Sequence, residues 1–377
     1  MTRKMWMATM LCFALLSSMV IGAEPIRLGG MASLQEGFGK SIEAGVRLAV
    51  HELNAAGGID GRPLEFTFLD SEHSPAIGRT ITQRLIFNDK VQAIIGCHAS
   101  PVVLAIADMM APNKILHIGM GSAPALSELG EKNPWFNRMR ENDLLTTKVV
   151  ANYAIDTLGL DSFACLYQSD QFGIGGRDSL LDILKQKNIP LLANEALNLQ
   201  DRDFTSQLLK VKQSGAKAVL MIAGIPALPI MVKQARQLVP DVTIFTVAMG
   251  ATKPFFDIAQ EASEGIYSVC VYTSDNQAEI VQKFNKAYEA LYGTPPLDFF
   301  AALGYDAVYT IRQAMLDAGT TTDQDKIRAA YRNIKDYHGV SGLEYNMSAN
   351  GEIIHELIMI TYENGKQKVV AVVKSGE

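Results

Sequence analysis

The chain has 377 residues, of which 48% are hydrophobic and 20% are charged, and its formal net charge is −6. A chain of this length exceeds a single comfortable hydrophobic core and predicts two domains, at roughly 150 residues for each domain. The acidic balance argues against nucleic acid as a partner.

The N-terminal segment has the pattern of a secretory signal peptide. Arg3 and Lys4 precede an apolar run at 5–20, and Ala23 is a small residue after which cleavage would leave a chain beginning at Glu24. Loss of the two basic residues changes the net charge from −6 to −8. A retained membrane anchor is the less favoured alternative, because the run is shorter than the ~20 residues that a span needs. We therefore expect a protein that is exported and soluble.

Apolar runs of strand length alternate with helical patterns along the rest of the chain. This alternation predicts an α/β fold, with largely parallel sheets covered by helices on both faces. The predicted strands fall into two series, 25–31, 64–70, 91–96 and 115–120, followed by 162–168, 189–197, 216–223, 243–249 and 265–272. Each interval is about the length of one helix, so each series predicts one doubly wound, Rossmann-like lobe.

Several predicted helices and turns have recognisable ends. The segment 38–58 carries apolar residues at helical spacing and stops at two glycines, and the segment 320–334 opens with threonines and an aspartate. Toward the C-terminus, residues 342–373 alternate apolar and polar side chains about the turns Asn350-Gly351 and Asn364-Gly365. This alternation predicts a terminal hairpin or meander.

The sequence carries no complete catalytic, metal or cofactor motif. HELNA at 51–55 lacks the second histidine of a metalloprotease helix, and FGIGGRD at 172–178 lacks the third glycine of a dinucleotide loop. The six histidines show no metal-ligand spacing, so we expect no cofactor, no metal and no enzymatic activity. A remote alternative is an exported serine hydrolase that uses Ser122, although Met120 and Pro124 occupy the glycine positions of a nucleophile elbow.

Cysteine usage leaves the redox state open. Cys97, Cys165 and Cys270 would remain after cleavage of the signal peptide, and none has CxxC spacing. They are interpreted either as buried thiols or as one bridged pair with one thiol left over.

Two strand-to-helix corners carry a serine that is closely followed by a proline. Ser100 and Ser122 each follow a predicted strand of the first series, and Ser100 is expected at a helix N-cap. Neighbouring parallel strands would bring both corners together at the carboxyl edge of the sheet, where open α/β sheets bind ligands. Hydroxyls and helix N-termini suit a carboxylate, and Gly121 would let the backbone approach closely. The alternative is that both serines only cap helices.

Five longer segments of the chain are similar to segments of a known protein family. They are HELNAAGGIDGRPLEF (51–66), VQAIIGCHASP (91–101), ILHIGMGSAPALSE (115–128), DFTSQLLKVKQSGAKAVLM (203–221) and ASEGIY (262–267). These segments resemble periplasmic solute-binding proteins of ABC transporters, of the branched-chain amino acid and amide, or Leu/Ile/Val-binding protein-like, family. The resemblance implies a type I periplasmic binding fold, with two lobes joined by a three-segment hinge that closes on a ligand.

This resemblance gives a division of the chain. No linker-like run separates the two series of strands, so the junctions at 140–144 and 271–274 are predicted to be short hinge crossings. We expect residues 24–142 and 273–342 to form lobe 1, and residues 143–272 and 343–377 to form lobe 2.

The resemblance also implies a set of ligand-binding residues. Ser100 and Ser122 match the hydroxyl residues that hold the ligand carboxylate, and Gly121 lies beside them. Three aromatic positions match residues that line or approach the cleft, namely Phe38, Phe172 and Phe299. His98 is interpreted mainly as a structural histidine, with a hydrogen bond to the ligand as the alternative.

The chain departs from the amino-acid binders of that family at positions that would contact the ligand. Met249 stands where an acidic residue would pair with the ligand ammonium, and Gly224 or Ile225 replaces a tyrosine of the second lobe. Burial of an ammonium without a counter-charge costs on the order of several kcal/mol. Together with the aromatic positions, Met249 and Ile225 therefore predict an apolar pocket for an aromatic, aliphatic or keto acid without a free ammonium. Asp170 or Asp275 is the alternative counter-charge.

The expected partners follow from the same resemblance. They are a small carboxylate ligand and the inner-membrane permease of an ATP-driven importer, and the protein itself is expected to be a monomer. A periplasmic sensor that reports its ligand to a membrane receptor is the alternative function. Asp306 is expected to be structural because it lies in a helical setting.

Overall fold

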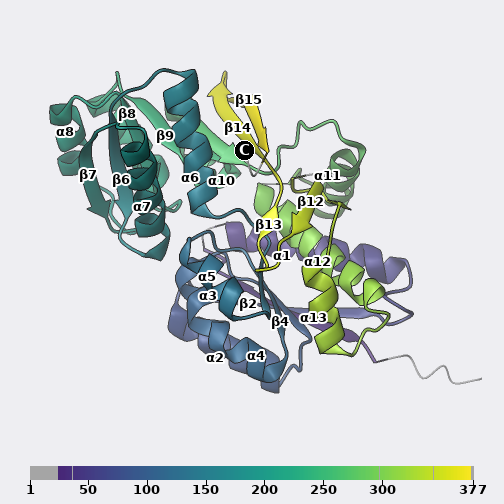
Figure 1. The fold of residues 1–377 in the computed structure, drawn as a ribbon. Helices are drawn as coiled ribbons and strands as arrows, with labels where there is room; N and C mark the ends of the chain where they lie inside the picture. The colour runs from purple at the N-terminus through teal and green to yellow at the C-terminus, as the bar shows by residue number, and fades with distance from the viewer. Residues whose placement is uncertain (1–23, 36, 297, 343, 375–377) are drawn as a thin grey trace, which may run out of the picture.

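A computed structural model of the protein describes residues 24–35, 37–296, 298–342 and 344–374. Within these ranges the chain forms two α/β lobes (Figure 1), which confirms the predicted fold class. No helix in the described ranges is long and apolar enough to cross a membrane. The predicted signal peptide, residues 1–23, lies outside the described residues.

The first lobe is built on a five-stranded sheet in the order β2-β1-β3-β4-β5, in which all neighbours are parallel. The strands are β1 (Ile26–Ala32), β2 (Leu64–Asp70), β3 (Ala93–Gly96), β4 (Leu116–Gly119) and β5 (Phe136–Arg138). The first four correspond to predicted strands, whereas the three-residue β5 is too short and too polar to be recognised. Because all five strands run in one direction, their carboxyl ends lie along one edge of the sheet.

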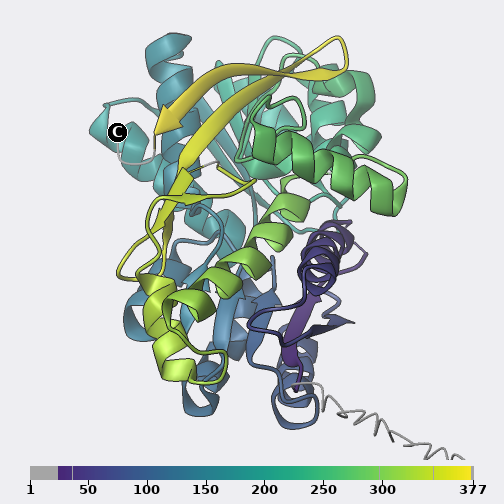
Figure 2. The ribbon, with the colours of Figure 1, turned by 90° about the vertical axis from the view of Figure 1, so that its right-hand side faces the viewer.

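The helices of this lobe come from two distant parts of the chain. They are α1 (Phe38–Ala55), α2 (Pro75–Phe87), α3 (Ser100–Ile106), α4 (Met110–Asn113), α5 (Ala125–Lys132), α11 (Glu279–Tyr292), α12 (Phe299–Asp317) and α13 (Gln324–Arg332). Figure 2 shows α1 (purple) beside α12 (light green). A Cβ atom at Gly45 would lie 2.0 Å from the carbonyl oxygen of Ala301, so the glycine allows the two helices to touch through their backbones.

The second lobe is built on a seven-stranded sheet in the order β15-β14-β10-β9-β8-β6-β7. Its strands are β6 (Phe163–Gln168), β7 (Leu191–Leu197), β8 (Ala218–Ile222), β9 (Thr243–Thr246), β10 (Tyr267–Cys270), β14 (Glu356–Glu363) and β15 (Lys366–Lys374). Its helices are α6 (Asp143–Asn152), α7 (Gln171–Gln186), α8 (Thr205–Ser214), α9 (Leu228–Leu238) and α10 (Lys253–Ala259). The predicted terminal hairpin is confirmed: Asn364 and Gly365 both have positive φ and connect β14 to β15.

A small three-stranded sheet lies beside the segments that pass between the lobes. Its strands are β11 (Tyr337–His338), β12 (Glu344–Met347) and β13 (Ile353–Ile354). Arg138 at the end of β5 donates to Glu352 at 3.0 Å, so this part of the chain contacts the first lobe. The lobe boundaries expected at 142/143, 272/273 and 342/343 remain a prediction.

The hinge region is anchored from α12. The buried carboxylate of Asp306 accepts hydrogen bonds from the backbone N–H groups of Val340 and Ser341, at 2.9 and 2.7 Å, and from the Ser341 hydroxyl at 2.6 Å. Gly342 in turn donates to the carbonyl oxygen of Val271 at 2.8 Å. Asp306 thus has contacts that agree with the structural role expected for it.

The cysteines of the described ranges are free thiols. Cys97, Cys165 and Cys270 are all buried, and none of them forms a disulfide within those ranges. Burial raises the pKa of the Cys165 and Cys270 thiols to about 12. Of the two interpretations left open by the sequence, buried thiols are therefore the one observed.

Candidate functional site

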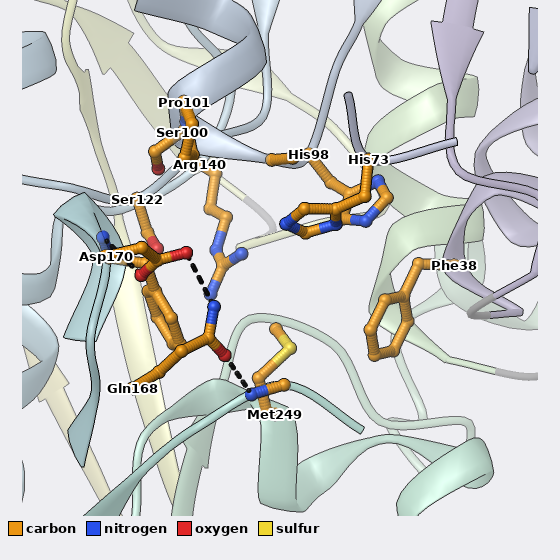
Figure 3. Close-up of a pocket in the computed structure, with 13 residues that line it drawn as sticks. Phe38, His73, His98, Ser100, Pro101, Ser122, Arg140, Gln168, Asp170 and Met249 are labelled. Carbon is orange, nitrogen blue, oxygen red and sulfur yellow. Dashed lines mark hydrogen bonds between the residues drawn. The ribbon is translucent and has the colours of Figure 1, made fainter. Parts of the chain in front are cut away.

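A pocket lies between the two lobes (Figure 3), and its empty volume of about 410 Å³ includes open solvent. Twelve of the thirteen lining residues lie in segments that follow the carboxyl end of a strand, and the other, Gln168, is the last residue of β6. The thirteen residues are Phe38, His73, His98, Ala99, Ser100, Pro101, Ser122 and Arg140 from the first lobe, and Gln168, Asp170, Phe172, Gly224 and Met249 from the second. The pocket therefore lies where ligands bind to open parallel sheets.

The two serine corners meet in this pocket. β3 and β4 are adjacent and parallel, and the Ser100 hydroxyl accepts a hydrogen bond from the backbone N–H of Ala123 at 3.1 Å. Ser100 was expected at a helix N-cap, but α3 begins at Ser100 itself and its N-cap is Ala99. The reason is that the Ser100 side chain binds the neighbouring corner and not its own helix.

Gly121 lies between the two corners but does not line the pocket. A Cβ atom at this position would lie 2.9 Å from the Ser100 hydroxyl oxygen and 2.8 Å from a Leu126 methyl group. The absence of a side chain therefore allows the corners to approach each other. Ser122 itself is only 2% exposed.

Arg140 is a pocket residue that the sequence placed only in a hinge crossing. It follows β5, its side chain is 2% exposed, and its Nε lies 3.4 Å from a carboxylate oxygen of Glu141. Its guanidinium carbon lies 5.5 Å from the ring centroid of Phe299 and 5.4 Å from that of Phe300. Within the described ranges, no hydrogen-bond acceptor reaches its buried Nη2.

Phe299 is one of the predicted cleft residues that the pocket does not include. It is 1% exposed and packs against the guanidinium of Arg140. Phe172 does line the pocket. Both aromatics were expected in loops, but each lies in the first turn of a helix, because the Asp170 side chain caps α7 and the Asp298 side chain caps α12.

The second-lobe wall is held together by Gln168. Its amide nitrogen donates to Asp170 at 2.5 Å, and its amide oxygen accepts from the backbone N–H of Gly224 at 3.0 Å. The other Asp170 oxygen accepts from the backbone N–H groups of Phe172 and Gly173. Both oxygens of this carboxylate are therefore engaged by the protein itself.

The remaining predicted residues divide between the lining and the core. Met249 lines the pocket from the short 3₁₀ helix Ala248–Ala251, and Phe38 lines it from the start of α1. Ile225 is buried beside the lining residue Gly224 and is not part of the lining itself. Asp275 is exposed and lies outside the pocket lining.

A sequence profile of the family described as periplasmic binding protein matches residues 27–367. The chain belongs to the periplasmic binding protein family. Family members are solute-binding proteins of ABC transporters and not enzymes, and the predicted family resemblance is confirmed.

Relatives of this periplasmic binding protein include amino-acid binders. The Leu/Ile/Val-binding protein homolog 1 of Brucella suis is 25% identical over 296 residues, which cover 78% of this chain and 77% of the relative. The substrate-binding protein LivJ of Streptococcus pneumoniae, solved in complex with isoleucine, superimposes with a TM-score of 0.84 at 23% identity, covering 93% of this chain and 99% of LivJ.

An aromatic-acid binder has the same fold. A solute-binding protein of an ABC transporter from Rhodopseudomonas palustris, solved in complex with benzoate, has a TM-score of 0.84 at 19% identity. The alignment covers 93% of this chain and 97% of that protein. At these identities the solved structures establish the shared fold of this periplasmic binding protein.

A titratable carboxyl lies directly behind the serine corners of this binding protein. Asp143 begins α6, and its backbone N–H donates to the carbonyl oxygen of Ser122 at 2.7 Å. Burial raises the pKa of the Asp143 carboxyl to about 7, and the nearby charge of Arg140 and the Ser122 hydroxyl oppose that rise. The protonation state of Asp143 therefore changes near neutral pH, next to the pocket.

Proposed function

We propose that this protein captures a small carboxylate that has no free ammonium group between its two lobes and delivers it to an importer in the inner membrane. The observation that carries the proposal is the buried guanidinium of Arg140, which lines the pocket with Nη2 unmatched by any acceptor in the described ranges. Ser100 and Ser122 supply hydroxyl groups beside it.

The guanidinium argues for an anionic ligand. Burial of a charge without a full set of partners costs on the order of several kcal/mol. Glu141 provides only one long contact to the Arg140 guanidinium, at 3.4 Å. A carboxylate in the pocket would accept from Nη2 and from the serine hydroxyls, in charge-assisted hydrogen bonds. Ligand binding would thus satisfy a cation that the protein alone leaves partly unpaired.

The same surroundings argue against an α-amino acid. An ammonium would lie in a pocket that already contains the positive charge of Arg140, and Met249 offers it no counter-charge. Asp170 is the one carboxylate among the described lining residues, and both its oxygens already accept hydrogen bonds from Gln168 and from the start of α7. The alternative in which Asp170 replaces the missing acid is therefore disfavoured.

The apolar lining favours a hydrophobic acid. Phe38, Phe172 and Met249 supply large contact areas with few rotamers to order, which suits aromatic, aliphatic or keto acids. The benzoate complex of the Rhodopseudomonas palustris protein supports an aromatic acid as the first class to test. We infer that the protein acts as a periplasmic monomer and that its partner is the importer's permease.

A ligand screen tests this proposal. We expect isothermal titration calorimetry of the mature chain to detect binding of at least one acid among benzoates, phenylacetates, branched aliphatic acids and branched keto acids. The corresponding α-amino acids, as matched controls, are expected to bind at least about tenfold more weakly, because the buried ammonium has no counter-charge. Selective binding of leucine or isoleucine over the keto acids would contradict the proposal.

Affinity for the carboxylate should increase as the pH falls from about 8 to about 6. The folded-state pKa of Asp143 is raised to about 7, so this carboxyl is ionised at the higher pH and neutral at the lower one. The ionised form places a competing negative charge beside Ser122 and Arg140, whereas a ligand carboxylate with a pKa of about 4 stays ionised throughout. We expect a gain of about three- to tenfold in calorimetry. Asp143→Asn should flatten the profile, and an unchanged slope in that variant would refute the assignment.

A further inference from the structure

Two glycines beside the pocket each face a proline of the opposite lobe. On α7 of the second lobe, a Cβ atom at Gly175 would lie 2.5 Å from Cδ and 3.3 Å from Cγ of Pro124, which precedes α5 of the first lobe. At the N-cap of α1 in the first lobe, a Cβ atom at Gly37 would lie 3.1 Å from Cγ of Pro254 at the start of α10. We name these two pairs, Gly175–Pro124 and Gly37–Pro254, the closing contacts.

The closing contacts lie next to residues that line the pocket. The first of them comes two residues after Ser122 in one lobe and about one helical turn after Phe172 in the other. The second directly precedes Phe38. Figure 3 shows Ser122 and Phe38 on opposite sides of the pocket. The two contacts therefore determine how far apart the lobes stand at both sides of the ligand site.

Both prolines are rigid obstacles. A proline ring is bonded to its own backbone nitrogen, so it has no rotamer that turns it out of the way. Pro124 is the N-cap residue of α5, and Pro254 lies in the first turn of α10, so each ring is fixed to the start of a helix. Carbon atoms that are not bonded to each other are about 3.5–4.0 Å apart at their optimum. A methyl group at position 175 would therefore require α7 to move back from Pro124 by about 1 Å.

The opposite lobe, and not its own, accounts for a glycine at position 175. Glycine in a helix interior is less favourable than alanine. Gly175 does not have the positive φ that favours glycine. The three heavy atoms nearest to a Cβ at this position all belong to Pro124, so the second lobe by itself has room for a methyl group. The missing side chain thus serves the approach of the two lobes.

We propose that the closing contacts set the size of the acid that the protein retains. The lobes come together until Gly175 meets Pro124 and Gly37 meets Pro254, and the hydrocarbon part of the acid has to fit the space that is enclosed at that point. A larger acid holds the lobes apart and loses contact with one wall of the pocket. This inference rests on the proposed function, because it takes a carboxylate between the lobes as given. It goes further by naming the residues that determine which length of acid fits.

Homologous series of acids test the inference. Each step adds one methylene group, and the series are 2-methylpropanoate to 5-methylhexanoate, benzoate to 3-phenylpropanoate, and 3-methyl-2-oxobutanoate to 5-methyl-2-oxohexanoate. In calorimetry of the mature wild-type chain, we expect affinity in at least one series to fall at least about tenfold at the step beyond the tightest-binding acid, although each buried methylene otherwise adds affinity. An affinity that rises to the end of every series that binds would overturn the inference.

Gly175→Ala should stop the lobes earlier and enlarge the enclosed space. We expect the tightest-binding acid to become longer by at least one methylene, and the best acid of the wild type to lose at least about tenfold in affinity. The melting temperature without ligand should not fall, because alanine favours the helix. Pro124→Ala in the same chain should restore the wild-type order of acids. It removes the ring carbons, and the nearest remaining heavy atom, the backbone nitrogen of residue 124, lies 3.6 Å from the added Cβ.

Gly176→Ala is the matched control on the same helix. A Cβ atom at Gly176 would lie 2.9 Å from Cδ1 of Ile222, within the second lobe, so Pro124→Ala should not change the affinities of that variant. An unchanged order of acids in Gly175→Ala, or a change that Pro124→Ala does not reverse, would overturn the inference and leave the proposed function intact. If the wild type binds none of these acids and none of the screened carboxylates, the proposed function fails together with it.

Discussion

Replacement of Arg140 by methionine should reduce the affinity for the best carboxylate from the screen by at least about a hundredfold. The guanidinium is 2% exposed and lines the pocket, so its hydrogen bonds to a ligand carboxylate are shielded from water. Charge-assisted hydrogen bonds of this kind contribute about 1.5–3 kcal/mol each, and two of them account for the expected loss. Calorimetry or a thermal-shift titration measures the effect.

The control for this variant has to account for Glu141. That carboxylate is 1% exposed, accepts from Arg140 and lies 3.9 Å from His355, so loss of the guanidinium alone would leave it poorly paired. We therefore compare Glu141→Gln with the double variant Arg140→Met plus Glu141→Gln. The first should fold and bind the ligand, and the second should fold but not bind. Affinity within about threefold of the control in the double variant would refute the role of Arg140.

Arg140 is also a pocket residue that was not predicted from the sequence. The rule that ligands lie beyond the carboxyl ends of parallel strands applies to all five strands of the first lobe. It located Ser100 and Ser122 because β3 and β4 are apolar runs that end in recognisable corners. The three-residue β5 carries no such run, so the residue that follows it was interpreted as part of a hinge only. Arg140 was therefore not predicted as a pocket residue because the short strand β5 before it was not recognised, and not because of its own side chain.

The prediction for the two aromatic positions differed from the structure for another reason. Phe172 and Phe299 both follow an aspartate that caps a helix, and both were interpreted as loop residues because the cap was not recognised. Phe172 lines the pocket at the start of α7. Phe299 supports Arg140 from behind, which a sequence pattern alone does not distinguish from contact with the ligand.

His73 and Gln168 could not be found by pattern at all. His73 is the second of two consecutive left-handed residues, and they are held by one tertiary contact of Asp70, with Leu34, together with a local one, with Glu72. Gln168 ends a strand that the sequence does predict, but its role comes from bonds to Asp170, the N-cap residue of α7, and to Gly224, in the loop that follows β8. Overall architecture follows from periodicity, whereas these positions depend also on long-range contacts, Asp70 with Leu34 and Gln168 with Gly224.

Replacement of Ser100 and Ser122 together by alanine should reduce carboxylate affinity by about a hundredfold or more. Each hydroxyl is expected to donate to the ligand carboxylate, and loss of both removes two hydrogen bonds to a charged group. Ser100 also accepts from the backbone N–H of Ala123, so its replacement should lower the free energy of unfolding by about 1 kcal/mol. Ser179→Ala, at a buried serine of α7 that donates to Gly175 outside the pocket lining, is the matched control and should keep full affinity.

The two single variants decide whether both serines act on one carboxylate. If each hydroxyl bound a separate group, the losses in binding free energy would add, because independent sites are additive. Two hydroxyls on the same carboxylate are coupled: after the first is lost, the anion shifts toward Arg140 and the remaining serine contributes a different amount. We therefore expect a double-mutant cycle to give a coupling of at least about 0.5 kcal/mol. Strict additivity would mean that the two hydroxyls bind separate groups. A double variant that binds as tightly as Ser179→Ala would remove the serine corners from the binding site.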